Sequence, residues 1–286
     1  MLESFPTELV MAIIVEAAEL FVVSDRATVH SLALTARYVF YLIRPILLRR
    51  FFISDSNHLQ VDRVLADQEA GALVLDLNIA SSLWTATPEV FNCLKNLRCI
   101  RGLSETIKTA IPLLSESAKS LLREIQLWDD ELIPNVPLGI THICLDPLGL
   151  GNPPLSYLVP WLRFVPSITH IGVEMVVRGD HRMSISPDDL ARGLGCTLTA
   201  GGPRLQRVAV RICGEPSDDE PWERLIVVLK SWSRTDDMVA MKADQRVVLW
   251  RDRRVFKDWS EDTQAAINDP LAGIDIWTSA RPLIEW

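Results

Sequence analysis

The sequence predicts an α/β fold in which a helical N-terminal module precedes a solenoid of parallel strands and helices. The pattern apolar-x-x-apolar-x-apolar returns along the middle of the chain at intervals of roughly 20–40 residues, which is typical of solenoid repeats. Each copy is short, rich in branched apolar residues and alternating at its end, as a strand is. The copies are A-L-V-L-D-L from Ala72, L-R-C-I-R-G from Leu97, L-R-E-I-Q-L from Leu122, I-T-H-I-C-L from Ile140, I-T-H-I-G-V from Ile168 and L-Q-R-V-A-V from Leu205.

Helix-like segments separate these strands. Thr87-Pro88-Glu89 and Ser186-Pro187-Asp188-Asp189 are typical helix starts, Pro154 precedes another apolar helical pattern, and Gly201-Gly202-Pro203 predicts a helix end. Strands that alternate with helices imply parallel pairing with right-handed crossovers. Stacking then places one apolar residue of each copy in a continuous inward ladder that no single repeat can bury alone. The predicted ladder consists of Leu75, Ile100, Ile125, Ile143, Ile171 and Val208.

Composition restricts the class of protein. The chain has 286 residues, 48% of them apolar and 23% charged, which is an ordinary globular composition long enough for a full core. A formal net charge of −8 argues against nucleic-acid binding, which requires a positive footprint. Its five cysteines are scattered without a C-x-x-C pair, so neither a disulfide framework nor a zinc site is expected.

No membrane association is expected. The N-terminus M-L-E-S-F-P lacks the basic region of a secretory signal, and the apolar stretch from Leu9 to Val23 carries Glu16 and Glu19 and is too short to span a bilayer. We therefore expect a soluble intracellular protein of the cytoplasm, the nucleus or both, with its cysteines reduced.

Residues 1–50 have a helical pattern. Pro6 or Thr7 can open a first helix, Asp25 can cap a second, and a third runs through Val39 to Ile46, with Pro45 expected to kink or end it. On the first helix Leu9, Ile13, Ala17 and Leu20 fall on one face. Three short helices with so little polar sequence have more apolar surface than they can hide, so the module is expected to pack on a neighbour or partner.

The two halves of this module resemble an F-box. That motif typically opens with Leu-Pro-x-Glu-Leu and closes with an apolar run, a basic residue and an aromatic. The first half, F-P-T-E-L-V-M-A-I-I from Phe5, matches at Pro6, Glu8, Leu9 and Ile13, and the second, from Ser31, matches at Leu32, Leu34, Arg37 and Leu42. The chain departs from the motif at Phe5, where leucine is usual, at Val39, where tryptophan is expected, and in the longer segment between the halves.

The repeats resemble an irregular leucine-rich-repeat array without the asparagine that usually follows the strand. V-P-S-I-T-H-I from Val165 resembles repeat starts of fungal F-box-like proteins, and the Asp-Trp and Asp-x-Trp pieces near Trp259 and Trp277 resemble their C-terminal ends. These resemblances divide the chain into an F-box-like helical module (1–50), an irregular leucine-rich-repeat-like solenoid (51–245) and a C-terminal capping segment (246–286). R-V-V-L-W from Arg246 predicts one more strand, and Trp250, Trp259 and Trp277 are expected to be capping core.

The resemblance implies a non-catalytic substrate-recognition subunit of a cullin–RING (SCF-type) ubiquitin ligase, without a cofactor. The module would dock on a Skp-type adaptor, and the solenoid would hold a protein substrate. The implied adaptor-binding residues are Phe5, Pro6, Leu9, Ile13, Leu34 and Leu42. Alternation along the strands gives candidates for substrate contact on the open strand face: Arg101, Arg123, Gln126, His142, His170 and Arg207.

Two alternatives remain. The module could be only a cap on a stand-alone repeat scaffold for protein–protein interaction, without a ubiquitin role, as the departures at Phe5 and Val39 allow. An enzyme could be built on His142 and His170, which parallel stacking would place about 5 Å apart, with Asp146 and Glu174 four residues after each. Threonine and histidine also simply suit a half-exposed strand position, which is the interpretation we favour, and no catalytic or metal-binding motif is present.

Overall fold

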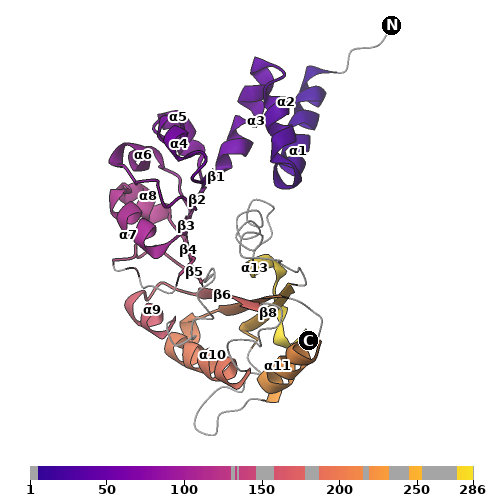
Figure 1. The fold of residues 1–286 in the computed structure, drawn as a ribbon, viewed down its shortest axis with the longest axis vertical. Coiled ribbons are helices and arrows are strands. Elements are labelled where there is room, and N and C mark those ends of the chain that lie inside the picture. The colour runs from indigo at the N-terminus through magenta and orange to yellow at the C-terminus, as the bar shows by residue number, and fades with distance from the viewer. Residues whose placement is uncertain are drawn as a thin grey trace.

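The protein is an arc of parallel strands with helices along its outer side. The computed structural model describes residues 6–129, 133, 135–145, 158–177, 187–214, 219–231, 245–252 and 276–285. Within these residues the strands form a nine-stranded sheet whose spatial order, β1 to β9, is the order of the sequence. Figure 1 shows the strands lining the inside of the arc, with α4 to α11 on the outside and α1 to α3 at its N-terminal end. Sequential parallel strands are the arrangement expected of a solenoid.

The N-terminal module consists of α1 (Thr7–Ser24), α2 (Arg26–Ala33) and α3 (Arg37–Arg49). Asp25 caps α2 as predicted, because its carboxylate accepts a hydrogen bond from the Thr28 N–H at 3.0 Å. The prediction that Pro45 could end the third helix was wrong, since α3 continues to Arg49. The three helices enclose a core of their own, separate from that of the solenoid: Ala18, Val29, Ala33, Val39, Ile43, Ile46 and Leu47.

The first strand, β1 (Arg50–Ile53), follows α3 directly, and none of the described strands covers its outer edge. The carbonyls of Arg50 and Phe52 are nevertheless satisfied. The Arg26 guanidinium donates to the Arg50 carbonyl at 3.2 Å, and the Asn57 amide donates to the Phe52 carbonyl at 2.9 Å. Covering edge carbonyls with side chains makes an edge strand a poorer template for pairing with another chain.

The first half of the solenoid has short elements. After β1 come α4 (His58–Leu65), α5 (Gln68–Leu73), β2 (Asp76–Ile79), α6 (Pro88–Cys93), β3 (Cys99–Gly102), α7 (Ser104–Leu113), α8 (Glu116–Leu121), β4 (Glu124–Leu127) and β5 (His142–Leu145). The predicted start at Thr87-Pro88-Glu89 is confirmed, since Pro88 is the first residue of α6.

The second half has longer strands, and its last strand reverses the direction of the chain. It consists of α9 (Leu158–Phe164), β6 (His170–Val177), α10 (Pro187–Gly201), the 3₁₀ turn η2 (Gly202–Arg204), β7 (Arg207–Gly214), α11 (Asp219–Ser231), β8 (Val247–Asp252), α13 (Ile276–Ser279), β9 (Arg281–Pro282) and η4 (Leu283–Glu285). Pro187 and Gly201 bound α10 as the sequence predicts, whereas Pro154 lies outside the described residues. β8 is parallel to β7, and β9 pairs with β8 in the antiparallel direction.

The inward ladder is present, with one correction. The predicted residues Ile100, Ile125, Ile143, Ile171 and Val208 pair in register and are fully buried. In β2 the ladder residue is Leu77, which pairs with Ile100, whereas Leu75 precedes the strand. The true copy therefore starts at Val74 (V-L-D-L-N-I), two residues later than predicted. A shift of two preserves the alternation of side chains, so the sequence pattern alone cannot distinguish the two registers.

Candidate functional site

The inner face of the sheet presents two rows of side chains in register. The first row consists of Arg50, Asp76, Cys99, Glu124, His142, His170 and Arg207. The second consists of Phe52, Asn78, Arg101, Gln126, Cys144, Gly172, Ala209 and Val248. Both rows face away from the buried ladder, because side chains alternate along a strand.

The structure places two of the predicted contact residues in the second row, but not on an open surface. Arg101 and Gln126 are neighbours in register, and the Arg101 Nε donates to the Gln126 Oε1 at 2.8 Å. Each side chain is less than one tenth exposed. The expectation that both face open solvent is therefore corrected: they form a buried polar pair that fixes the strand face.

Arg123 does not lie on the inner face of a strand. It precedes β4, and its guanidinium donates to the carbonyls of Ser120, Leu122 and Gly139. It therefore ties the end of α8 to the start of the next repeat. Alternation along the strand in fact excludes Arg123 from the inner face, because it is two residues before the ladder residue Ile125 and so falls on the same side as Ile125.

The histidine pair is formed as the parallel register predicts. The His142 and His170 rings stack with centroids 4.1 Å apart and an angle of 15° between their planes. The Nδ1 of each ring shares a hydrogen bond of 2.8 Å with the hydroxyl of the preceding threonine, Thr141 or Thr169. Burial and, secondarily, the nearby Arg207 lower the pKa of His170. The fold therefore favours the uncharged form of His170.

The C-terminal helix α13 lies across this pair. The Trp277 ring meets both imidazoles edge-on, with centroids 5.2 Å from His142 and 5.8 Å from His170. The Trp277 carbonyl accepts a hydrogen bond of 2.9 Å from Arg207. With Ile276, the tryptophan packs against a small apolar cluster on the same face that contains Cys144, Ala209 and Val248. Three of the six predicted contact residues, His142, His170 and Arg207, are thus in contact with the chain's own C-terminal segment.

Glu174, a candidate partner of the histidines, is engaged elsewhere. Arg211 lies between Glu174 and Asp252, with N···O distances of 2.5 and 2.7 Å, and all three side chains are almost fully buried. The Arg211 guanidinium also lies over the Trp250 ring, 4.3 Å from its centroid. Asp146, the other candidate, lies outside the described residues.

Burial raises the pKa of the Cys99 thiol well above its ordinary value, so this thiol is not activated as a nucleophile. Within the described residues no group of three or more His, Cys, Asp or Glu side chains could hold a metal ion.

The helices that the structure describes include none long and apolar enough to cross a membrane.

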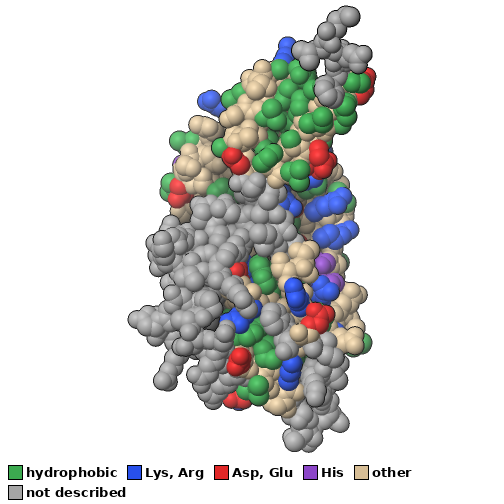
Figure 2. All heavy atoms as spheres, turned by 90° about the vertical axis from the view of Figure 1, so that its right-hand side faces the viewer, with side chains coloured by type: hydrophobic (Ala, Val, Ile, Leu, Met, Phe, Trp, Pro, Cys, Tyr) green, Lys and Arg blue, Asp and Glu red, His purple; other side chains and the backbone are tan. Residues whose placement is uncertain are grey.

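The helical module carries an exposed apolar surface. Figure 2 shows hydrophobic side chains gathered over this end of the molecule. Of the predicted adaptor-binding residues, Pro6, Leu9, Ile13 and Leu34 are exposed, Leu42 is half-buried against the module's core, and Phe5 lies outside the described residues. Leu20, which the sequence places on the same helix face as Leu9 and Ile13, is exposed too. The sequence did not single out the other exposed apolar residues of the module: Val10, Phe21, Tyr38, Phe40 and Tyr41.

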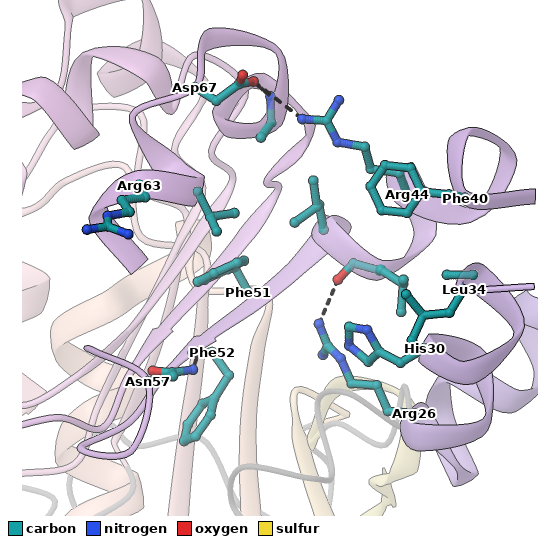
Figure 3. Close-up of a pocket in the computed structure, with 15 residues that line it drawn as sticks. Arg26, His30, Leu34, Phe40, Arg44, Phe51, Phe52, Asn57, Arg63 and Asp67 are labelled. Carbon is teal, nitrogen blue, oxygen red and sulfur yellow. Dashed lines mark hydrogen bonds and ion pairs between the residues drawn. The ribbon is translucent and has the colours of Figure 1, made fainter. Parts of the chain in front are cut away.

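A cavity of about 740 Å³ lies between this module and the first repeat (Figure 3). Its apolar wall includes Phe40 and Leu47 from α3, and Phe51 and Phe52 from β1. Three arginines line it, Arg26, Arg44 and Arg63, with Asp67 as its acidic residue. Sequence reasoning missed this cavity because its walls come from elements that pack together only in the fold.

Sequence reasoning also missed α13 on the inner face, although a signal was present. The second row holds polar side chains in β2 to β4 but Cys144, Gly172 and Ala209 in β5 to β7. A Cβ atom built on Gly172 would meet the Cys144 Sγ at 2.9 Å and atoms of Ile276 and Trp277 at 3.2 Å. A run of small residues on a strand face indicates that another segment covers it.

Comparison with known proteins gives one distant structural likeness. No protein-family model matches the chain, and no curated protein matches it. Among solved structures, the leucine-rich repeat-containing protein LegL7 from Legionella pneumophila is similar at 12% identity and a TM-score of 0.36, over 80% of this chain and 91% of that one.

Proposed function

We propose that the chain is a non-catalytic interaction protein whose helical module docks on a Skp-type adaptor of a cullin–RING ubiquitin ligase and whose solenoid holds a protein substrate. The observation that carries the proposal is the exposed apolar surface of the module. The module already encloses its own core, and the outward apolar residues of α1 are not part of that core. Leu9 is 44% exposed and Ile13 is 56% exposed. Apolar patches of this kind mark protein interfaces.

The F-box resemblance supports the identity of the partner. Of the positions that match the motif, Pro6 immediately precedes α1 and is exposed, and Leu9 and Ile13 lie on the exposed side of α1, while Ala18 on the same helix is buried. An adaptor that covers them would remove from water the apolar surface that the fold leaves exposed.

The inner strand face supports the scaffold role. Its side chains are fixed by hydrogen bonds, ion pairs and ring contacts, as in the Arg101–Gln126 pair and the histidine stack. Pre-organised side chains on a curved sheet lower the entropic cost of binding a protein segment. α13 contacts β5 to β7 and also reaches Glu124 of β4 through Trp277, so our candidate surface for substrate is the end of this face on β1 and β2, with the half-buried Arg50 and Asp76.

The test is co-expression with a Skp-type adaptor followed by size-exclusion chromatography. We expect the wild type to co-elute with the adaptor, and Leu9→Asp/Ile13→Asp to weaken binding at least roughly tenfold, because two charges would be buried in an apolar interface. Leu59→Asp on α4 is the matched control, because Leu59 is 81% exposed but lies outside the module. A folded wild type that does not bind the adaptor would instead leave a repeat scaffold capped by its N-terminal helices.

A further inference from the structure

We propose that the cavity between the helical module and the first repeat binds a small anionic amphiphile, an aliphatic carboxylate whose chain fills the cavity and whose head group meets Arg26. The site is distinct from the exposed face of α1 and from the inner strand face. It does not depend on the proposed adaptor.

The size and lining of the cavity suit a small molecule. Its volume of about 740 Å³ lies within the range of roughly 300–1,000 Å³ typical of ligand sites. Leu47 and Leu48 from α3 and Phe51 and Phe52 from β1 line it on one side. Val64 and Ala70 line it on the first-repeat side, and the exposed Leu34 and Val64 mark its opening to solvent.

The charge of the lining selects an anion. Arg26, Arg44 and Arg63 line the cavity with one carboxylate, Asp67, in a chain whose net charge is −8, and Figure 3 shows the Arg63 guanidinium pointing away from the other two. The Arg44 guanidinium lies 3.4 Å from Asp67 and 3.7 Å from Glu69, so this arginine already has acidic partners. A cationic lining within an acidic protein is unexpected unless it faces a negative ligand.

Arg26 is a partly buried cation of the lining, whereas Arg63 is exposed. Its Nη2 donates to the Leu47 carbonyl at 2.6 Å and to the Arg50 carbonyl at 3.2 Å, and the part of the chain that the structure describes places no carboxylate within ion-pairing distance of it. Burial lowers the pKa of this guanidinium, which shows that its charge is partly removed from water. A carboxylate is the planar partner that a guanidinium binds through two parallel hydrogen bonds.

The neighbouring histidine favours the same ligand. His30 lines the cavity one turn along α2 from Arg26, and Figure 3 shows its ring beside that arginine. Burial, followed by the charge of Arg26, lowers the pKa of His30. A bound carboxylate would reverse the second effect, because a negative charge stabilises the imidazolium.

The experiment measures binding of decanoate, decyltrimethylammonium and 1-decanol to the full chain by calorimetry below their aggregation concentrations. We expect one decanoate per chain, bound at least roughly tenfold more tightly than either of the other two, since only the carboxylate meets Arg26. Equal binding of all three would show adventitious apolar partition and overturn the proposal, as would the absence of saturable decanoate binding.

A matched pair of variants locates the site. Val64→Trp places a large side chain in the opening of the cavity, whereas Leu59→Trp adds the same side chain to α4 outside it. We expect Val64→Trp to weaken decanoate binding at least roughly tenfold and Leu59→Trp to change it less than about twofold. Unchanged binding in Val64→Trp would place the ligand elsewhere and overturn the proposal.

Two further measurements test whether Arg26 contacts the head group and whether the cavity serves adaptor binding instead. Arg26→Lys retains the charge but not the bidentate geometry, so it should weaken decanoate binding while leaving decanol binding unchanged; weakening of both would overturn the assignment of Arg26. If the wild type does not bind decanoate and the Val64→Trp variant no longer co-elutes with the adaptor, the cavity belongs to the protein interface instead.

Discussion

At the scale of single residues, the buried Arg211 shows how the solenoid accommodates charge. Its two acidic partners come from the neighbouring strands β6 and β8, so the three side chains join adjacent repeats through one guanidinium. Buried ion pairs contribute little net stability relative to apolar groups, but removal of one member leaves an uncompensated charge. The position is therefore more sensitive to substitution than a surface arginine.

Arg211→Met should lower the free energy of unfolding by about 3–5 kcal/mol, because the carboxylates of Glu174 and Asp252 would remain buried without this arginine. Urea unfolding followed by tryptophan fluorescence measures the change. Arg192→Met is the control: its pair with Asp189 is exposed and should contribute less than about 1 kcal/mol. Similar losses in the two variants would contradict this account of the cluster.

The histidine stack predicts a dependence of stability on pH. The pKa of His170 is lowered in the fold, so below its ordinary value of 6.5 the unfolded chain binds a proton more readily than the folded chain does. The contribution of neutral His170 to the free energy of unfolding is therefore complete above pH 6.5. It declines as the pH falls from 6.5 toward the pKa of His170 in the folded protein.

Urea unfolding between pH 8 and pH 5 tests this sign. His170→Phe keeps a ring that can stack on His142 but removes the titrating group, so its stability should fall less between pH 7 and pH 5 than that of the wild type. Titrating groups away from the stack contribute equally to both proteins and cancel in the comparison. Parallel profiles would show that His170 does not contribute to the pH dependence.

At the scale of elements, the packing of α13 depends on small residues in the strands beneath it. Gly172→Val would place methyl groups where Cys144, Ile276 and Trp277 already lie, and over-packing of this kind costs about 1–3 kcal/mol. We expect α13 to lift from the sheet and the C-terminal segment to become sensitive to protease, with a lower melting temperature.

Gln206→Val is the matched control for the introduced side chain, because Gln206 is exposed immediately before β7. Limited proteolysis should cleave the C-terminal segment of Gly172→Val faster than that of the wild type or of Gln206→Val. Equal cleavage in all three would mean that α13 does not depend on this close contact.

At the scale of the whole molecule, the cores of the helical module and of the solenoid adjoin each other directly. The module's core ends at Leu47, and the solenoid's core begins at Ile53, so β1 follows the module without a linker. A partner on α1 and a second on the inner strand face would therefore be held by one continuous body. The cavity lies where the two cores meet, so a ligand there would contact both parts.

The sequence by itself determined the local and repetitive features. Capping at Asp25, the start of α6 at Pro88 and the alternation within each strand depend on residues close in the chain, and the repeated pattern predicted parallel strands and the adjacency of His142 and His170.

Only the tertiary structure decided the register of the first copy, the burial of Arg101 and Gln126, the placement of α13 and the cavity beside Arg26. A two-residue shift leaves the alternation intact, so Leu75 and Leu77 are equivalent in pattern. The exposure of a strand residue depends on what covers the strand, and for His142 and His170 that is Trp277, more than a hundred residues away. Local patterns report which face a side chain takes, whereas burial and cavities arise from contacts between distant segments that periodicity does not encode.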